Sequence, residues 1–224
     1  MSNAPVPMSM RSLPVDPDRT YFHVPWFVAW INGKPDYRVI APGKIIQAVK
    51  GDLCWLCGQQ IGPAKAFVIG PMCSLNRTSA EPPCHVECAE YAVQVCPFMT
   101  RPQMKRNEKD LPANKKEMPG FGLKRNPGVV LVWQTRSYMP FRATAGEAGI
   151  LFELGDPLAV SFWAEGRLAT REEVLASIDS GLPLLAEMAI EDPLPGAMDE
   201  LNRRYEAACA LLPASHVSAV GAQP

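Results

Sequence analysis

The chain has 224 residues, of which 47% are hydrophobic and 20% are charged, which is ordinary for a globular protein able to bury a core. No apolar run approaches the ~20 residues that a membrane-spanning helix needs, so the composition excludes an integral helical membrane protein. The net charge is −1, but residues 1–146 hold 18 Lys or Arg against 10 Asp or Glu, and residues 147–206 hold 4 against 13. Halves of opposite sign indicate surfaces for different partners, or two halves that attract each other.

The first twenty residues contain Pro5, Pro7, Pro14 and Pro17 and lack the unbroken apolar stretch of a secretory signal. We expect a flexible arm over residues 1–20. Seven cysteines without an export signal favour reduced thiols and metal binding over disulfides, and an odd number leaves one thiol unpaired. These features predict a cytoplasmic protein.

The next segment predicts a β-hairpin followed by a short helix. Residues 21–31 are aromatic and β-branched, and Asn32-Gly33 separates them from residues 37–40. Both central positions of such a turn need positive φ, which Asn and Gly tolerate best. Residues 44–50 follow Pro42 with a helical pattern that Gly51 ends.

A strand and a second helix are predicted around two cysteine-containing motifs. The run CWLCG at residues 54–58 has the form of a zinc knuckle, in which glycine permits the left-handed bend. Residues 66–69 predict a strand and residues 71–83 a loop. The pattern over residues 85–96 predicts a helix that Pro97 ends.

The rest of the chain predicts a basic linker or surface loop and then a second structured part. Residues 100–127 are rich in Lys, Arg, Asn and Pro and nearly free of large aliphatic side chains. Strand-like runs follow at residues 129–135, 150–154 and 158–164. Thr170 and Glu173 form a capping-box pattern that opens a helix, which Gly181 and Pro183 break or kink, and a last helix is predicted over residues 198–212. We expect residues 213–224 to be disordered.

The strongest signal in the chain is a set of metal-binding residues. Cys54 and Cys57 form one close pair, and His85 and Cys88 form another at i and i+3, on one side of the predicted helix. Two such pairs of soft ligands match a tetrahedral Zn²⁺ site in which the protein fills every position. We therefore expect a structural Zn²⁺ in a treble-clef-like module.

Other cysteine combinations are possible at this stage. Cys84 and Cys88, at i and i+4, could complete an all-Cys site without His85. Cys73, Cys96 and Cys209 are expected to pack as small apolar side chains. A second metal held by Cys73, Cys84 and Cys96 would lack paired spacing.

Together these elements predict an α+β protein. Residues 21–99 form the hairpin and zinc module, residues 100–127 the basic stretch, and residues 128–212 a small antiparallel β segment with two acidic helices. The runs CWLCG (54–58), NRTSAEPPCHVECAEYA (76–92), NPGVVLVW (126–133) and GRLATREEVLASI (166–178) resemble an uncharacterised family of bacterial and phage proteins. The resemblance covers most of residues 10–190. It implies a bacterial or phage source and brings no activity with it.

The leading functional hypothesis is a zinc-stabilised intracellular module that binds a protein or a nucleic acid. The basic stretch would supply phosphate contacts from Arg101, Lys105, Arg106, Lys109, Lys115, Lys116, Lys124 and Arg125. The acidic C-terminal helices would instead offer a negative face to a basic partner. The alternative is a zinc-dependent hydrolase, nuclease or deaminase-like, because His85-x-Glu87 beside cysteine pairs is similar to the zinc deaminases. Cys88 would then fill the position that a catalytic water needs.

Overall fold

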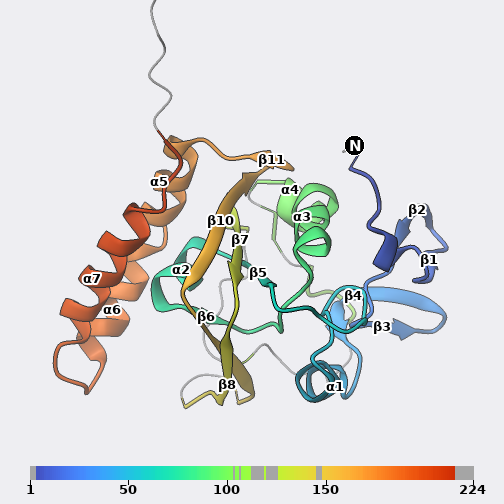
Figure 1. Ribbon diagram of the computed structural model, residues 1–224, viewed down its shortest axis with the longest axis horizontal. Helices are drawn as coiled ribbons and strands as arrows, with labels where there is room; N and C mark the ends of the chain where they lie inside the picture. The colour runs from blue at the N-terminus through green and yellow to red at the C-terminus, as the bar shows by residue number, and fades with distance from the viewer. Residues whose placement is uncertain are drawn as a thin grey trace, which may run out of the picture.

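The computed structural model describes residues 4–102, 104–105, 107–111, 119, 126–144 and 148–214, which form a mixed α+β protein of helices and small antiparallel sheets. A central sheet separates α5, α6 and α7 on one side from α3 and α4 on the other (Figure 1). The helices are α1 (Lys44–Gly51), α2 (Pro71–Asn76), α3 (Val86–Val95), α4 (Pro97–Thr100), α5 (Arg171–Asp179), α6 (Leu182–Glu191) and α7 (Ala197–Cys209). None of the helices in these ranges has the length and apolar character to cross a bilayer.

The central sheet joins the two halves of the chain. Its strand order is β11–β10–β7–β5, and every neighbouring pair is antiparallel. Its strands are β5 (Lys65–Ile69), β7 (Val130–Thr135), β10 (Pro157–Ala164) and β11 (Arg167–Leu168). Because β5 precedes the basic stretch and β7 follows it, the half with the four candidate metal ligands and the C-terminal half share one sheet.

Alternating side chains on β5 and β7 build a separate core on each face of this sheet. Phe67, Ile69, Leu131 and Trp133 are buried in one cluster with α2 and α5. Ala66, Val130 and Val132 are buried in a second cluster with α3 and the metal-binding cysteines. Strands covered on both faces are expected to be apolar at successive positions, as the run from Val129 to Trp133 is.

The N-terminal residues carry regular structure where we had predicted a flexible arm. A 3₁₀ turn, η1, spans Met8–Met10, and β1 (Val15–Asp16) pairs with β2 (Arg19–His23). Met10 is only 2% exposed and lies in the cluster that contains the metal-binding cysteines. Burial of this side chain fixes the arm against the metal-binding half.

The predicted strand over residues 21–31 is divided, with β2 ending at His23 and β3 (Val28–Ile31) beginning after Pro25. β3 pairs with β4 (Lys34–Ile40) across Asn32 and Gly33, whose φ angles are 52° and 78°. These positive values are the ones that an Asn-Gly turn provides.

The predicted loop over residues 71–83 contains α2 and the short strand β6 (Thr78–Ser79), so that prediction was wrong. Pro71 stands at the start of α2, where its missing N–H costs nothing. Pro97 likewise ends α3 and begins the one-turn helix α4. β6 pairs with β9 (Ile150–Leu154), which pairs with β8 (Tyr138–Arg142).

Hydrogen bonds of Asn126 join the two ends of the basic stretch. The Asn126 side chain, 2% exposed, donates from its amide to the carbonyls of Phe98 (2.6 Å), Met99 (3.3 Å) and Arg101 (2.9 Å). Its backbone N–H donates to the carbonyl of Met104 (2.9 Å). Asn126 therefore holds the two ends of the stretch together at its base.

The C-terminal region has three helices, so the prediction of two was wrong. The capping box of α5 is confirmed: the Glu173 N–H donates to Thr170 Oγ1, and the Thr170 N–H donates to the Glu173 carboxylate. After Gly181 the chain begins α6, with Pro183 in its first turn. Proline at that position starts a helix, whereas we had taken it to break one.

Candidate metal centre

The first ligand pair lies in a tight loop after α1. The Cys54 N–H donates to the Gln59 carbonyl (2.7 Å), and the Gly58 N–H donates to the Cys54 carbonyl (2.8 Å). Gly58 has a φ of 74°, and a Cβ atom there would lie 2.5 Å from the Trp26 ring. Only glycine fits this bend, which turns the Cys54 and Cys57 side chains to the same side.

The second pair lies at the start of α3. His85 is the N-cap residue and Cys88 lies in the first turn. Cys84, just before, exchanges backbone hydrogen bonds with Ala66 of β5, at 2.9 and 2.7 Å. The start of α3 is thereby attached to the central sheet, and the positive end of the helix dipole favours thiolate at Cys88.

The four predicted ligands come together in one cluster. One donor atom from each of Cys54, Cys57, His85 and Cys88 lies within 4.8 Å of all the others. His85 Nδ1 is 3.3 Å from Cys57 Sγ and 3.9 Å from Cys88 Sγ. A tetrahedral zinc ion with Zn–S of about 2.3 Å and Zn–N of about 2.05 Å would space its ligand atoms by about 3.5–3.8 Å. The cluster therefore has the dimensions of a site for one metal ion.

Neighbouring groups orient both ligands of the second pair. His85 Nε2 is 3.0 Å from the carbonyl of Gln60, which can only accept, so Nε2 carries the proton and Nδ1 presents its lone pair to the sulfurs. Ser9 Oγ lies 3.2 Å from Cys88 Sγ, and the Gln59 side chain donates to the Ser9 carbonyl (3.0 Å). The N-terminal arm therefore contributes directly to the surroundings of the metal-binding sulfurs.

Among the sulfurs, Cys54 is the one most strongly held as thiolate. Hydrogen bonds from Cys57, Cys84 and Cys88 lower the pKa of the Cys54 thiol far below its ordinary value. The backbone N–H groups of His85 (3.3 Å) and Cys57 (3.5 Å) also donate to its sulfur. The hydrogen bond to Cys54 raises the pKa of Cys84, which places Cys84 beside the cluster as a thiol donor. His85 completes the four-atom group and Cys84 does not, which favours the Cys₃His set over the all-Cys set.

The other cysteines lie apart from this group. Cys73 and Cys209 are partly buried against the core on the opposite face of the central sheet. Burial raises the pKa of Cys73 and of Cys96, and the nearby Glu81 carboxylate adds to both shifts. Within the described ranges the Cys₃His group is the one cluster of metal-binding side chains, so the second metal that Cys73, Cys84 and Cys96 might have held does not form there.

The predicted nucleic-acid contacts are only partly covered by the structure. Arg101, Lys105 and Lys109 have exposed side chains. Arg38 of β4 donates to the carbonyls of Asn107 (3.0 Å) and Lys109 (2.8 Å), so this part of the basic stretch lies against β4. The remaining predicted contacts, Arg106, Lys115, Lys116, Lys124 and Arg125, lie outside the described residues.

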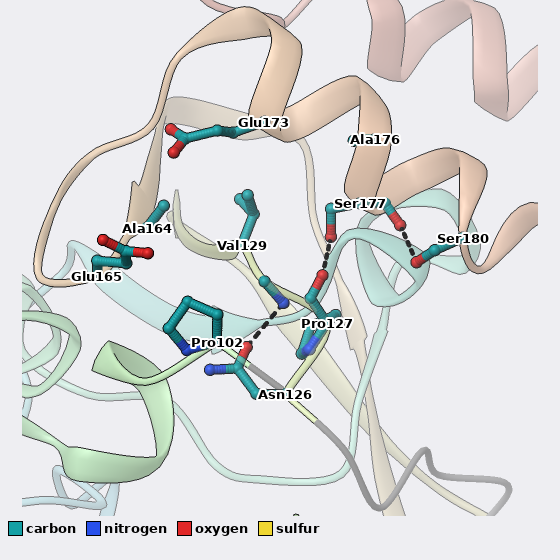
Figure 2. Close-up of a pocket in the computed structure, with 11 residues that line it drawn as sticks. Pro102, Asn126, Pro127, Val129, Ala164, Glu165, Glu173, Ala176, Ser177 and Ser180 are labelled. Carbon is teal, nitrogen blue, oxygen red and sulfur yellow. Dashed lines mark hydrogen bonds between the residues drawn. The ribbon is translucent and has the colours of Figure 1, made fainter. Parts of the chain in front are cut away.

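A cavity of about 320 Å³ lies at the base of the basic stretch, between Pro102, Asn126 and α5 (Figure 2). Three of its polar side chains, those of Ser177, Asn126 and Glu173, are bonded within the protein. The Ser177 hydroxyl donates to the Pro127 carbonyl (2.6 Å), and Asn126 Oδ1 accepts from the Gly128 N–H (2.8 Å). Glu173 is engaged by Arg167 at 2.6 Å. The cavity therefore presents no set of free groups for chemistry.

Sequence reasoning missed the residues around the ligands. Ser9 is 79 positions from Cys88, and nothing in the local pattern indicates that contact. Gln60 contributes a backbone carbonyl, which every residue type carries. The ligands themselves were found because their spacing repeats a known chemical requirement.

Comparison with known proteins gave no match to a family model, to a curated protein or to a solved structure. The chemistry of the cluster is therefore the basis for assigning a role.

Proposed function

We propose that this protein is a zinc-stabilised intracellular binding module of bacterial or phage origin. The observation that carries the proposal is the convergence of Cys54, Cys57, His85 and Cys88 within 4.8 Å. Four protein ligands complete a tetrahedral shell, as they do in structural zinc sites. Thiolate and imidazole suit zinc, whereas Mg²⁺ and Ca²⁺ prefer oxygen ligands.

The surroundings of the cluster support a structural role. Cys54 and Cys88 are fully buried, and Cys57 is 5% exposed. Three thiolates and a neutral imidazole would leave a net charge of −1 on the Zn²⁺ complex, distributed over sulfurs that accept hydrogen bonds. Structural zinc can contribute on the order of 10 kcal/mol to folding. The order of knuckle, β5 and ligand-bearing α3 along the chain supports a treble-clef-like arrangement, with α2 and β6 inserted before the helix.

The alternative function, a zinc-dependent hydrolase, would need an open coordination position and a general base. Cys88 occupies the fourth position of the cluster, and Glu87 has an exposed side chain and is not part of the cluster. His23, a candidate base in a nuclease, lies 3.3 Å from the Leu13 carbonyl through its Nδ1. These contacts favour binding over catalysis as the role of the protein.

The test compares two cysteine variants of the full chain. Metal analysis of the parent protein should give about one zinc per chain. Cys57→Ser should lose the zinc and lower the melting temperature sharply or precipitate, because the core around the cluster loses its cross-link. Cys209→Ser, a partly buried cysteine of α7 outside the cluster, is the matched control and should keep both zinc and melting temperature.

A spectrum keeps the test decisive if Cys57→Ser does not fold. The Co²⁺-substituted parent should show intense visible bands from tetrahedral cobalt and sulfur-to-cobalt charge transfer. Cys84→Ser should leave that spectrum unchanged, whereas His85→Ala should alter it. A parent that binds no zinc, or a weak octahedral cobalt spectrum, would overturn the proposal.

A further inference from the structure

The outer face of α6 and the turn after it expose an unusual concentration of apolar side chains. Leu184, Met188, Ile190 and Leu194 are 39%, 38%, 72% and 70% exposed, and all four lie within eleven consecutive residues. The inner face is also apolar, with Leu185 8% exposed against the core. A helix that is apolar on nearly all sides is normally covered on all sides.

Acidic side chains accompany these apolar ones on the same face. Leu184, Glu187, Met188 and Glu191 follow the i, i+3, i+4, i+7 spacing of one helix face. The surrounding segment, residues 172–202, contains eight Asp or Glu and no Lys or Arg. Glu173 and Glu200 are paired with Arg167 and with Arg203 and Arg204, and the other acidic residues leave a net negative charge around α6. The face is therefore amphipathic, with apolar side chains set among residues of net negative charge.

Within the part of the chain that the structure describes, this face of α6 is left exposed to solvent. α6 packs on α5 and α7, and these helices lie on the side of the central sheet opposite to α3 (Figure 1). At the end of the helix, Asp192 Oδ1 accepts from the Leu194 N–H (2.9 Å), which fixes the turn that presents the Leu194 side chain.

We propose that the outer face of α6 with the turn after it, formed by Leu184, Glu187, Met188, Ile190, Glu191 and Leu194, is a docking surface for a basic amphipathic segment of a protein partner. This inference rests on the proposed binding function and names its surface and partner class. The apolar side chains would cover the apolar face of the incoming segment, while its Lys or Arg side chains would meet Glu187 and Glu191.

The charges disfavour the other occupants of such a face. Nucleic acids and anionic membranes carry negative charge, which the acidic field would repel. A second copy of the chain that used the same face would bring Glu187 and Glu191 close to their own counterparts. A basic protein segment is the occupant for which both the apolar and the charged parts are complementary.

The test uses the zinc-loaded full chain and labelled peptides. The probe is a fluorescein-labelled peptide of about 18 residues, patterned with Leu and Lys so that a helix has one apolar and one basic face. We expect binding in the micromolar range, about 1–50 µM by fluorescence anisotropy, weakening as salt is raised. A twin peptide with Glu in place of each Lys should not bind.

Matched variants locate the surface. Ile190→Asp, and separately Glu187→Lys with Glu191→Lys, should each weaken binding of the basic peptide by about tenfold or more. Ile46→Asp on α1, where Ile46 is 53% exposed, and Glu165→Lys in the β10–β11 turn are the controls and should bind as the parent does. All of these positions have exposed side chains outside the core, and the zinc content and melting temperature of each variant verify its fold.

Several results would overturn the docking surface. One is equal binding of the basic peptide by the Ile190→Asp and Ile46→Asp variants, and another is binding of the acidic peptide as tight as that of the basic one. The other two are pelleting of the protein with anionic vesicles, and self-association of the protein that Ile190→Asp abolishes. Failure of the peptide to bind a parent that holds one zinc per chain would also overturn it. Failure of a zinc-loaded parent to bind the peptide would leave the proposal of a structural zinc intact. A parent that holds no zinc would contradict the zinc proposal, whatever the peptide does.

Discussion

Removal of the Asn126 side chain should destabilise the protein far more than its position in a polar segment suggests. Its amide donates to three carbonyls, at 2.6, 2.9 and 3.3 Å, and its Oδ1 accepts from the Gly128 N–H at 2.8 Å. Asn126→Ala removes all four interactions, at a site where residue Asn126 is only 2% exposed. The carbonyls belong to the end of α4 and the residue after it, so the base of the basic stretch loses its closure.

The magnitude follows from these contacts. A hydrogen bond contributes about 1 kcal/mol net, and a buried group left without a partner costs about 1–3 kcal/mol. The adjoining cavity allows water to reach some of the freed carbonyls, and the 3.3 Å contact is weak, so we expect a loss of about 3–4 kcal/mol in the free energy of unfolding. For a chain of this length that corresponds to a fall in melting temperature of about 6–15 °C.

Urea unfolding followed by tryptophan fluorescence would measure this loss, with Asn202→Ala on the exposed face of α7 as the control. Asn126→Asp adds a second comparison, because a carboxylate cannot donate to the carbonyls and would stand against their oxygens. We expect Asn126→Asp to be at least as destabilising as Asn126→Ala. A loss below about 1 kcal/mol for Asn126→Ala, or an unaffected Asn126→Asp, would refute the role given to these hydrogen bonds.

Two further variants test contacts near the metal centre. Ser9→Ala removes the hydroxyl that lies 3.2 Å from Cys88 Sγ, and it should weaken zinc affinity by about tenfold in chelator competition. Ser12→Ala is the control and should keep the affinity of the parent. Equal zinc affinities of the Ser9→Ala variant and the parent would contradict a role for the N-terminal arm. Burial raises the pKa of the Glu81 carboxyl from 4.5 to about 7, so the folded state retains its proton between these values and the free energy of unfolding falls as pH rises through that window. Glu81→Gln, which resembles the protonated form, should therefore be more stable than the parent at pH ~8 by no more than about 3 kcal/mol and nearly equal to it at pH ~4. The difference between variant and parent removes the pH dependence of zinc binding itself, and a difference that is the same at both pH values would count against the shift.

The metal-binding residues could be predicted from the sequence because their geometry is local. A knuckle needs two cysteines and a glycine within five residues, and His85 and Cys88 share a helix face by spacing alone. The Thr170–Glu173 capping box was readable for the same reason. In each case the interacting groups lie within one turn of backbone.

Some features could not be predicted from the sequence because they depend on contacts between distant segments. Others were missed because a proline can either end a helix or begin one. Pairing of β5 with β7 joins segments about sixty residues apart, and no local pattern specifies that register. Burial of Met10 requires the cluster that receives it. Residues 71–83 were predicted as a loop, and Gly181 with Pro183 as a break or kink, although Pro71 and Pro183 each stand in the first turn of a new helix.

The shared sheet links the metal centre to the proposed docking surface. The cluster packs on one face of β5 and β7, and α5 packs on the other, so loss of the metal would remove one of the two cores that hold these strands. Because α6 rests on α5 and α7, its position depends on that sheet although it lies far from the ligands. Zinc would accordingly determine whether the binding layer is assembled, while substitutions on the outer face of α6 would change what it binds without disturbing the metal. Chelation of zinc from the parent should therefore abolish both peptide binding and cooperative unfolding. A zinc-free chain that still binds the basic peptide would show that the docking surface does not depend on the metal.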